Sequence, residues 1–226
     1  NVRQQPGSGK AYTATGTALT LSAATASTDT MYCVFLGRAL QTVTPATNSI
    51  TNAMITDNTI ESGKLFSTFK NGITEADQWR LTTSFTGDAD PIASNLERVD
   101  NSGWGKLGTG MSESSGIFTF PSTGIWFVKF RLNTYHTAQN RYATARIEIT
   151  TNNSSYGLVA SSDAGMENSS GATIYQNTLT ETLIDCTDTS NVKVKFVVAN
   201  EDDSTTVVGN TDITLTSMMF IRLGDT

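Results

Sequence analysis

The sequence has little of the chemistry from which catalytic and metal sites are usually built. It holds one histidine and two cysteines in 226 residues, and charged residues make up only 16% of the chain. Any triad or dyad with an imidazole base would have to use His136, which no nucleophile-elbow sequence accompanies. Cys33 and Cys186 are too far apart in the chain for a zinc-ligand pattern or a disulfide framework, so we interpret both as buried free thiols.

Long apolar runs and excess positive charge are also missing. No stretch approaches the roughly 20 apolar residues that cross a bilayer. Acidic residues outnumber basic ones by 21 to 15, which gives a net charge of −6. A phosphate backbone or an anionic lipid surface repels such a chain. We therefore expect no nucleic-acid partner and no membrane insertion.

Two glycine-rich segments look like phosphate-binding motifs. Residues 103–108 read Gly-Trp-Gly-Lys-Leu-Gly and satisfy Gly-x-Gly-x-x-Gly. That motif binds a pyrophosphate where a helix opens directly after it, and residues 109–116 are too rich in glycine and serine to form one. Residues 7–10, Gly-Ser-Gly-Lys, lack the other positions of a phosphate-binding loop. The sequence thus predicts a glycine-rich surface loop and no cofactor.

Acidic residues gather at two places, Asp88 with Asp90 and residues 201–203. Neither place has the spacing of an EF-hand, so we interpret both as solvated turns and predict no metal site, with calcium binding as the alternative. A glycosidase would need two carboxylates across a groove, and the repeats of a β-helix, a common scaffold of such enzymes in phages, are absent. We predict that the chain is not an enzyme.

The densest apolar run spans residues 116–132 and predicts a central strand. After Gly124 the side chains alternate between two faces: Trp126, Val128, Phe130 and Leu132 on one, and Ile125, Phe127, Lys129 and Arg131 on the other. The first face is uniformly apolar and must be buried. The second begins apolar and ends charged, which predicts partial cover by a second sheet edge or another subunit. Pro121 and Gly124 bracket a tight turn before the strand.

Residues 116–127, Gly-Ile-Phe-Thr-Phe-Pro-Ser-Thr-Gly-Ile-Trp-Phe, resemble the signature of the tumour necrosis factor and complement globular-head superfamily. In that family a Gly-x-Phe-x-x-Pro-x-x-Gly-x-aromatic pattern joins two central strands of a jelly roll. Residues 216–223, Thr-Ser-Met-Met-Phe-Ile-Arg-Leu, resemble its closing strand. The resemblance covers roughly residues 76–226. It implies a trimeric head that recognises a partner with exposed loops and catalyses nothing.

Strand patterns recur through residues 76–226 and predict a two-sheet sandwich or jelly roll with no helix longer than a turn. We expect strands near residues 78–85, 96–99, 117–120, 125–133, 142–150, 156–160, 173–185, 192–200 and 212–223.

The first 75 residues predict two further parts. Residues 1–45 form a small β module for attachment, with strands on either side of Gly16 and a third at residues 30–40. Residues 12–21 and 34–45 resemble small β modules of bacteriophage tail-fibre proteins. In residues 46–75, apolar side chains recur every five residues, which fits neither helix nor strand; this segment is either a threefold stalk or an extended linker. The whole chain is therefore predicted to be all-β.

Loops alternate between the two ends of an antiparallel sandwich. If the last strand descends toward the stalk, residues 134–140, 163–172 and 201–211 point away from it. We expect these loops to contact a carbohydrate or polar epitope, with His136 exposed, unless they are merely solvated. The candidate ligand-binding residues are Tyr135, His136, Gln139, Asn140, Asp163, Glu167, Asn168, Asp202 and Asp203.

The resulting hypothesis is a non-enzymatic homotrimeric fibre or spike subunit on the surface of a virion. Its N-terminal module would bind other virion proteins, and its head a glycan or protein of the host surface. One alternative is a purely structural virion protein, such as a capsid decoration or fibre cap. Another is a secreted recognition protein of the same head family. Glycans at the Asn-x-Ser sites Asn153 or Asn168 would favour this alternative.

Overall fold

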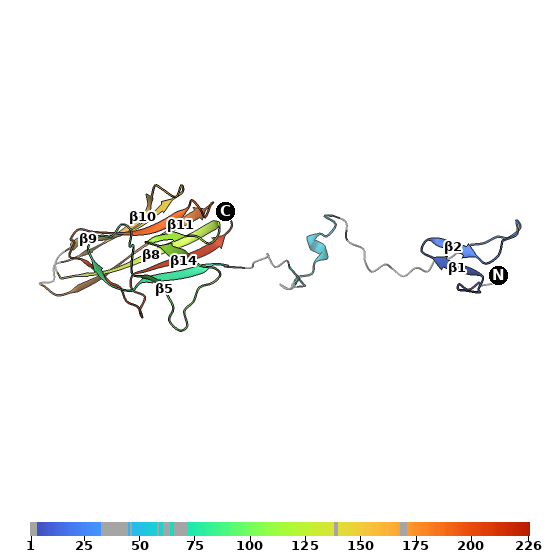
Figure 1. Cartoon of the computed structure of the whole chain (residues 1–226), viewed down its shortest axis with the longest axis horizontal. Helices are drawn as coiled ribbons and strands as arrows, with labels where there is room; N and C mark the ends of the chain where they lie inside the picture. The colour runs from blue at the N-terminus through green and yellow to red at the C-terminus, as the bar shows by residue number, and fades with distance from the viewer. Residues whose placement is uncertain are drawn as a thin grey trace. The chain divides into compact units, whose positions relative to one another are not determined.

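The computed structural model describes residues 4–32, 45, 47–57, 59–60, 64–65, 72–137, 140–167 and 171–226. The chain divides into two compact units, Asn1–Glu61 and Ser62–Thr226 (Figure 1). Within the described ranges the regular structure is β-strand apart from one short 3-10 helix, η1 (Asn52–Met54), which confirms the all-β prediction. No helix in these ranges is long and apolar enough to cross a membrane.

The first unit holds an antiparallel hairpin of β1 (Tyr12–Thr15) and β2 (Ala18–Leu21). Gly16 turns the chain between them with a φ of 61°, which confirms the expected strand–turn–strand. Most hairpin residues are exposed, and a two-stranded hairpin alone is marginally stable in water. The expected third strand falls largely on residues 33–40, outside the described residues, as does Cys33.

The second unit, the head, consists of two antiparallel sheets (Figure 1). The first has five strands in the order β10-β9-β12-β7-β6, and their bounds are Gly157–Met166, Asn140–Thr150, Lys193–Asn200, Ile117–Thr119 and Ser112–Ser114. The second has seven strands in the order β4-β13-β8-β14-β3-β5, and β11 pairs with the free side of β8. Their bounds are Phe85–Thr86, Thr206–Val207, Gly124–His136, Ser217–Gly224, Ala76–Leu81, Leu96–Arg98 and, for β11, Ile174–Cys186.

The core lies between the two sheets and is dominated by aromatic rings. The inward side chains of β8 are fully buried, as its apolar face predicts: Trp126, Val128, Phe130 and Leu132. Phe118 of β7 packs on Phe196 and Phe220 with ring centroids 5.4 and 5.2 Å apart. Such close, tilted ring pairs fill the space between layers and give the sandwich much of its hydrophobic stabilisation.

The turn from β7 to β8 carries the chain from one sheet to the other, and two glycines make it possible. Gly116 precedes β7 with a φ of 82°, and Gly124 opens β8 with a φ of 136°. A Cβ on Gly116 would lie 2.5 Å from the Ile92 carbonyl oxygen, and one on Gly124 would lie 2.4 Å from the Gly224 carbonyl oxygen. Both positions therefore require glycine for conformation and for space.

Strand ends differ from those expected. β8 runs on to His136 and β10 to Met166, while β14 begins only at Ser217. The short strands β6 and β13 carry no apolar alternation and were not expected. The polar ends extend as strand because their backbone groups find partners across the sheet, and composition alone does not reveal such pairing.

A surface at the distal end of the head

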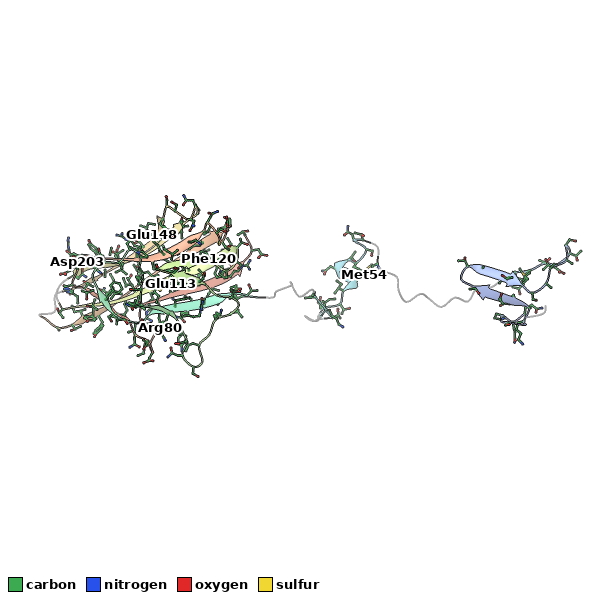
Figure 2. The ribbon with its side chains drawn as sticks, viewed as in Figure 1. Met54, Arg80, Glu113, Phe120, Glu148 and Asp203 are labelled. Carbon is green, nitrogen blue, oxygen red and sulfur yellow. The ribbon has the colours of Figure 1, made fainter. Side chains whose placement is uncertain are left out.

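Strand register brings the three connections between β8 and β9, β10 and β11, and β12 and β13 to one end of the head. Ile174 lies opposite His136, Met166 opposite Asn140, and Thr206 opposite Tyr135. At the other end Ala76, the first residue of β3, lies opposite Ile221 of β14. We call the end with the three connections the tip; Figure 2 shows Asp203 there, away from the C-terminus marked in Figure 1.

His136 is buried, with 5% of its surface exposed, so the expectation of an exposed loop histidine is wrong. β8 continues past the expected end at residue 133, and the period-2 alternation turns Thr134 and His136 inward. The His136 Nε2 atom lies 2.7 Å from Ser204 Oγ and 3.6 Å from Asp202 Oδ2. The histidine thus holds the loop between β12 and β13 against the end of β8.

Serine, histidine and aspartate meet here, but not in the geometry of a catalytic triad. A triad places its serine and its carboxylate on opposite ring nitrogens. Ser204 and Asp202 instead approach the same Nε2, and Ser204 Oγ donates to Asp202 Oδ1 at 2.6 Å. His136 Nε2 and Ser204 Oγ are within hydrogen-bond distance of each other, and the Ser204 hydroxyl donates to Asp202. This arrangement fixes the loop between β12 and β13.

Asn140 is fully buried, contrary to its expected place in a contact loop. It opens β9, and its side-chain amide donates to Thr205 Oγ1 at 2.6 Å. In this position the amide satisfies a buried hydroxyl of the neighbouring loop. Asn140 therefore supports the tip from below and is not available to a ligand.

Arg141 and Glu201 form the main ion pair of the tip. The backbone N–H and the guanidinium of Arg141 both donate to the Glu201 carboxylate. The backbone hydrogen bond, with the guanidinium, holds the pKa of Glu201 below its usual value, and the carboxylate raises the pKa of Arg141. Hydrogen bonds from Ser204 likewise lower the pKa of Asp202. Both acids are thus ionised at neutral pH, and the tip presents charge.

The remaining candidates are dispersed. Asp163 lies within β10, where it accepts a hydrogen bond from Thr144 Oγ1 at 2.5 Å, so its expected place in a loop is wrong. Asp203 and Glu167 are exposed on connections at the tip, and Tyr135 is half-buried at the end of β8. Gln139 and Asn168 lie outside the described residues. The assignment of ligand binding to all nine stays a prediction.

Three exposed residues at the tip were not among the candidates. Tyr175, 68% exposed, lies beside Tyr135 with ring centroids 5.4 Å apart, and Tyr142 and Arg141 are exposed at the start of β9. The sequence did not indicate Tyr175 as a tip residue, because no local pattern shows that β11 pairs with β8. The tip therefore combines two tyrosine rings with fixed charges, which suits stacking and hydrogen bonding.

Metal binding finds no support in the described ranges. They contain no group of three or more histidine, cysteine, aspartate or glutamate side chains that could hold an ion.

Comparison with known proteins supports the fold and nothing finer. No family model matches the sequence, and no curated protein matches it. Among solved structures, Eiger TNF from S. frugiperda superposes with a TM-score of 0.51 at 9% identity, over 69% of this chain and 96% of that chain. Murine APRIL in its pH 5.0 crystal structure gives 0.49 at 8% identity, over 66% and 98%. The likeness to Eiger TNF confirms the jelly-roll β-sandwich of the head.

Proposed function

We propose that the chain is a non-enzymatic, homotrimeric fibre or spike subunit of a virion, and that its head binds the host cell surface through the tip. The trimer rests on exposed apolar side chains on one face of the head. The contact role rests on the composition of the tip, and the virion assignment on the tail-fibre resemblance of the first 45 residues.

The observation that carries the proposal is the exposed side of β11. Leu179 and Leu183 are 42% and 60% exposed, and they lie on the side of the strand that also carries Asn177, Glu181 and Asp185. We call these two leucine side chains the β11 strip. Subunit interfaces bury exposed leucines of this kind together with polar neighbours.

The strip continues across the sheet. Leu183 lies opposite Phe127 of β8, which lies opposite Ile221 of β14, so one apolar row crosses three strands on the outer face. In the next row, Glu181 lies opposite Lys129. The outer face of this sheet thus combines an apolar row with charged side chains of both signs, a composition that a second copy of the chain can cover.

An edge strand and the broad face beside it are different surfaces, so their contact is heterologous and closes into a ring when the rotation permits. We propose three copies around one axis, each placing its β11 edge on the neighbour's outer face. In this arrangement the three tips lie together at one end and form a multivalent contact surface.

The tip supports a recognition role. Its tyrosine pair, Tyr135 with Tyr175, offers flat amphipathic surface, and the Arg141–Glu201 pair offers fixed donors and acceptors. Buried hydrogen bonds from His136 and Asn140 fix the loop beneath, which reduces the entropy lost on binding. A glycan or a polar protein epitope fits such a surface.

The N-terminal hairpin supports an attachment role, because its exposed side chains provide no core of their own. Docking on another virion protein would supply the missing contacts. We therefore propose that the protein lies on the outer surface of the particle.

The first test is the solution mass of the full chain by light scattering, which should be three times the 24.2 kDa of one chain. The second is binding of the labelled protein to candidate host cells, with Tyr175→Ala as the tip variant and Leu19→Ala, in the hairpin, as the control. If the protein is a trimer that binds no host surface, only a structural role remains. If it is a monomer, the proposal loses its basis.

A further inference from the structure

A second surface of the head has the features of a ligand site. An open groove of about 530 Å³ lies on the five-stranded sheet. Its lining includes Glu113, Ile117, Thr119, Asn153, Tyr156 and Lys193. Figure 2 shows Glu113 on the body of the head, away from Asp203 at the tip.

Strand pairing places the groove on the outer face of that sheet. Thr119 of β7 lies opposite Lys193 of β12, and Ile117 lies opposite Lys195 two residues on. The side chains of these four residues are half-buried, while Phe118 and Val194 between them enter the core. The groove therefore has a firm floor of paired strands, with the segment before β10 as its wall.

Tyr156 forms the aromatic part of that wall. The Lys195 ammonium lies 5.0 Å from the centre of its ring, and Asp90 and Glu148 neutralise that ammonium at 2.5 and 3.0 Å. Burial raises the pKa of the Tyr156 phenol, so the ring stays neutral at physiological pH. The cation–π contact fixes the ring, and the rest of its surface faces the groove.

The turn that carries Asn153 is rigid. Asn152 Oδ1 accepts from the N–H groups of Ser154 and Ser155 at 3.0 and 2.9 Å, and the Asn153 N–H donates to the Asn191 carbonyl at 2.9 Å. Within the described parts of the chain, no hydrogen bond is recorded for the Asn153 side-chain amide. A donor and an acceptor are therefore presented to the groove on a fixed turn.

Lys193 supplies the positive charge of the groove. Its ammonium donates to Thr119 Oγ1 at 3.1 Å, and no ion pair is recorded for it among the residues that the structure describes. Glu113 opposite is held by the Gly116 N–H, which donates to Oε1 at 2.6 Å. The groove thus offers the Lys193 ammonium, one carboxylate held in place, an amide and an aromatic ring.

We propose that this groove binds a saccharide that carries a carboxylate, such as a uronic or sialic acid residue. The apolar C–H face of the sugar ring packs on Tyr156 and Ile117. Its hydroxyl groups donate to Glu113 and pair with the Asn153 amide, and its carboxylate accepts from Lys193. A shallow groove ringed by polar groups is the shape that a hydrated sugar can enter without losing all of its water.

The site is compatible with the proposed trimer but does not depend on it. β6 and β7 form the edge of the five-stranded sheet opposite β10, and β10 is the strand that contacts β11, with Thr178 Oγ1 donating to Ser162 Oγ at 2.8 Å. The β11 face can therefore be covered while the groove stays open.

The experiment is saturation-transfer NMR on the full chain with methyl β-glucuronide, methyl α-sialoside and methyl β-glucoside. The acidic glycosides should bind at least about tenfold more tightly than the neutral one, because only they place a carboxylate on Lys193. Lys193→Gln should remove this preference, and Tyr156→Ala or Asn153→Ala should weaken all binding. Lys106→Gln is the matched control outside the groove, and Tyr175→Ala reports on binding at the tip.

Unchanged thermal unfolding midpoints would show that the variants fold. Absence of transfer to every glycoside overturns the proposal. So does loss of binding in Tyr175→Ala with retention in Tyr156→Ala, because the sugar would then occupy the tip. Failure of the groove variants leaves the trimer and host-binding tests unaffected.

Discussion

Gly116 and Gly124 explain why the most recognisable stretch of this chain is a backbone motif. Each adopts a positive φ, and each lies against a carbonyl oxygen where a Cβ would not fit. Between them the chain leaves one sheet and enters the other. The absence of a side chain at these two positions is therefore as necessary to the sandwich as the buried rings of Phe118 and Trp126.

Replacing Gly116 by alanine should lower the free energy of unfolding by about 2–3 kcal/mol, from strain and from contact with Ile92. Urea unfolding of the full chain measures the loss. Gly105→Ala is the matched control, since a Cβ there meets nothing within 4 Å, and it should be neutral or slightly stabilising. Equal midpoints for the two variants would show that the turn relaxes at no cost.

Cys186 should be unreactive in the folded protein. It is fully buried, and burial raises the pKa of its thiol to about 11, so the reactive thiolate is scarce at a pH near 8. In a Cys33→Ser background, a thiol reagent such as dithiobisnitrobenzoate should react slowly with the native protein and at once in guanidinium chloride. Fast labelling of the native protein would contradict the burial of β11 at its last residue.

The Arg141–Glu201 pair should make the tip sensitive to acid. Because the folded protein lowers the pKa of Glu201, the stability it contributes is present above the usual glutamate pKa of about 4.3 and is lost as the pH falls through the lower folded value. The thermal midpoint of the wild type should exceed that of Glu201→Gln near neutral pH. The difference should shrink toward zero on acidification. Glu167→Gln, at an exposed position of the tip, should show no such trend.

At the scale of elements, the centres of the strands were predictable and their ends were not. The alternation from Trp126 to Leu132 predicted the central strand and its buried face, because burial demands apolar side chains at every second position. Tyr135 and His136 extend that strand by pairing with Tyr175 and Ile174, which no local pattern reveals. The expected placement of two candidate residues was wrong for the same reason: His136 and Asn140 look like loop residues in the sequence, yet both are buried beneath the loops.

The β11 strip gives the sharpest test at this scale. Leu183→Lys places a charge in the proposed interface and should convert the trimer to monomers, measured by light scattering. Since Leu183 is 60% exposed in a single chain, each monomer should keep its fold by circular dichroism. Ile213→Lys, at a side chain 58% exposed between β13 and β14, should remain trimeric. If both variants stay trimeric, the strip is not the interface.

The whole head keeps a jelly roll in common with Eiger TNF at 9% identity. This is physically reasonable, because a sandwich needs side chains of suitable size and alternation more than particular residues. The same tolerance explains why the fold could be predicted from the sequence while the residues exposed at the tip could not. Surface connections are free of the constraints of the core, so no general pattern predicts their residues.

If the assembly is obligate, the thermal midpoint should rise with protein concentration, because association stabilises only the folded chains. Differential scanning fluorimetry over a wide range of concentrations measures this dependence. Leu183→Lys should show none. A wild-type thermal midpoint that does not change with protein concentration would indicate that each head folds independently.

Both ends of the head's chain lie at the same pole. Ala76 enters beside Ile221, and the last residues follow directly from β14. Cargo fused after Thr226 would therefore sit beside the point of entry and leave the opposite pole clear. With this geometry, a reporter can be fused at one pole of the head while the recognition surface at the opposite pole is changed independently.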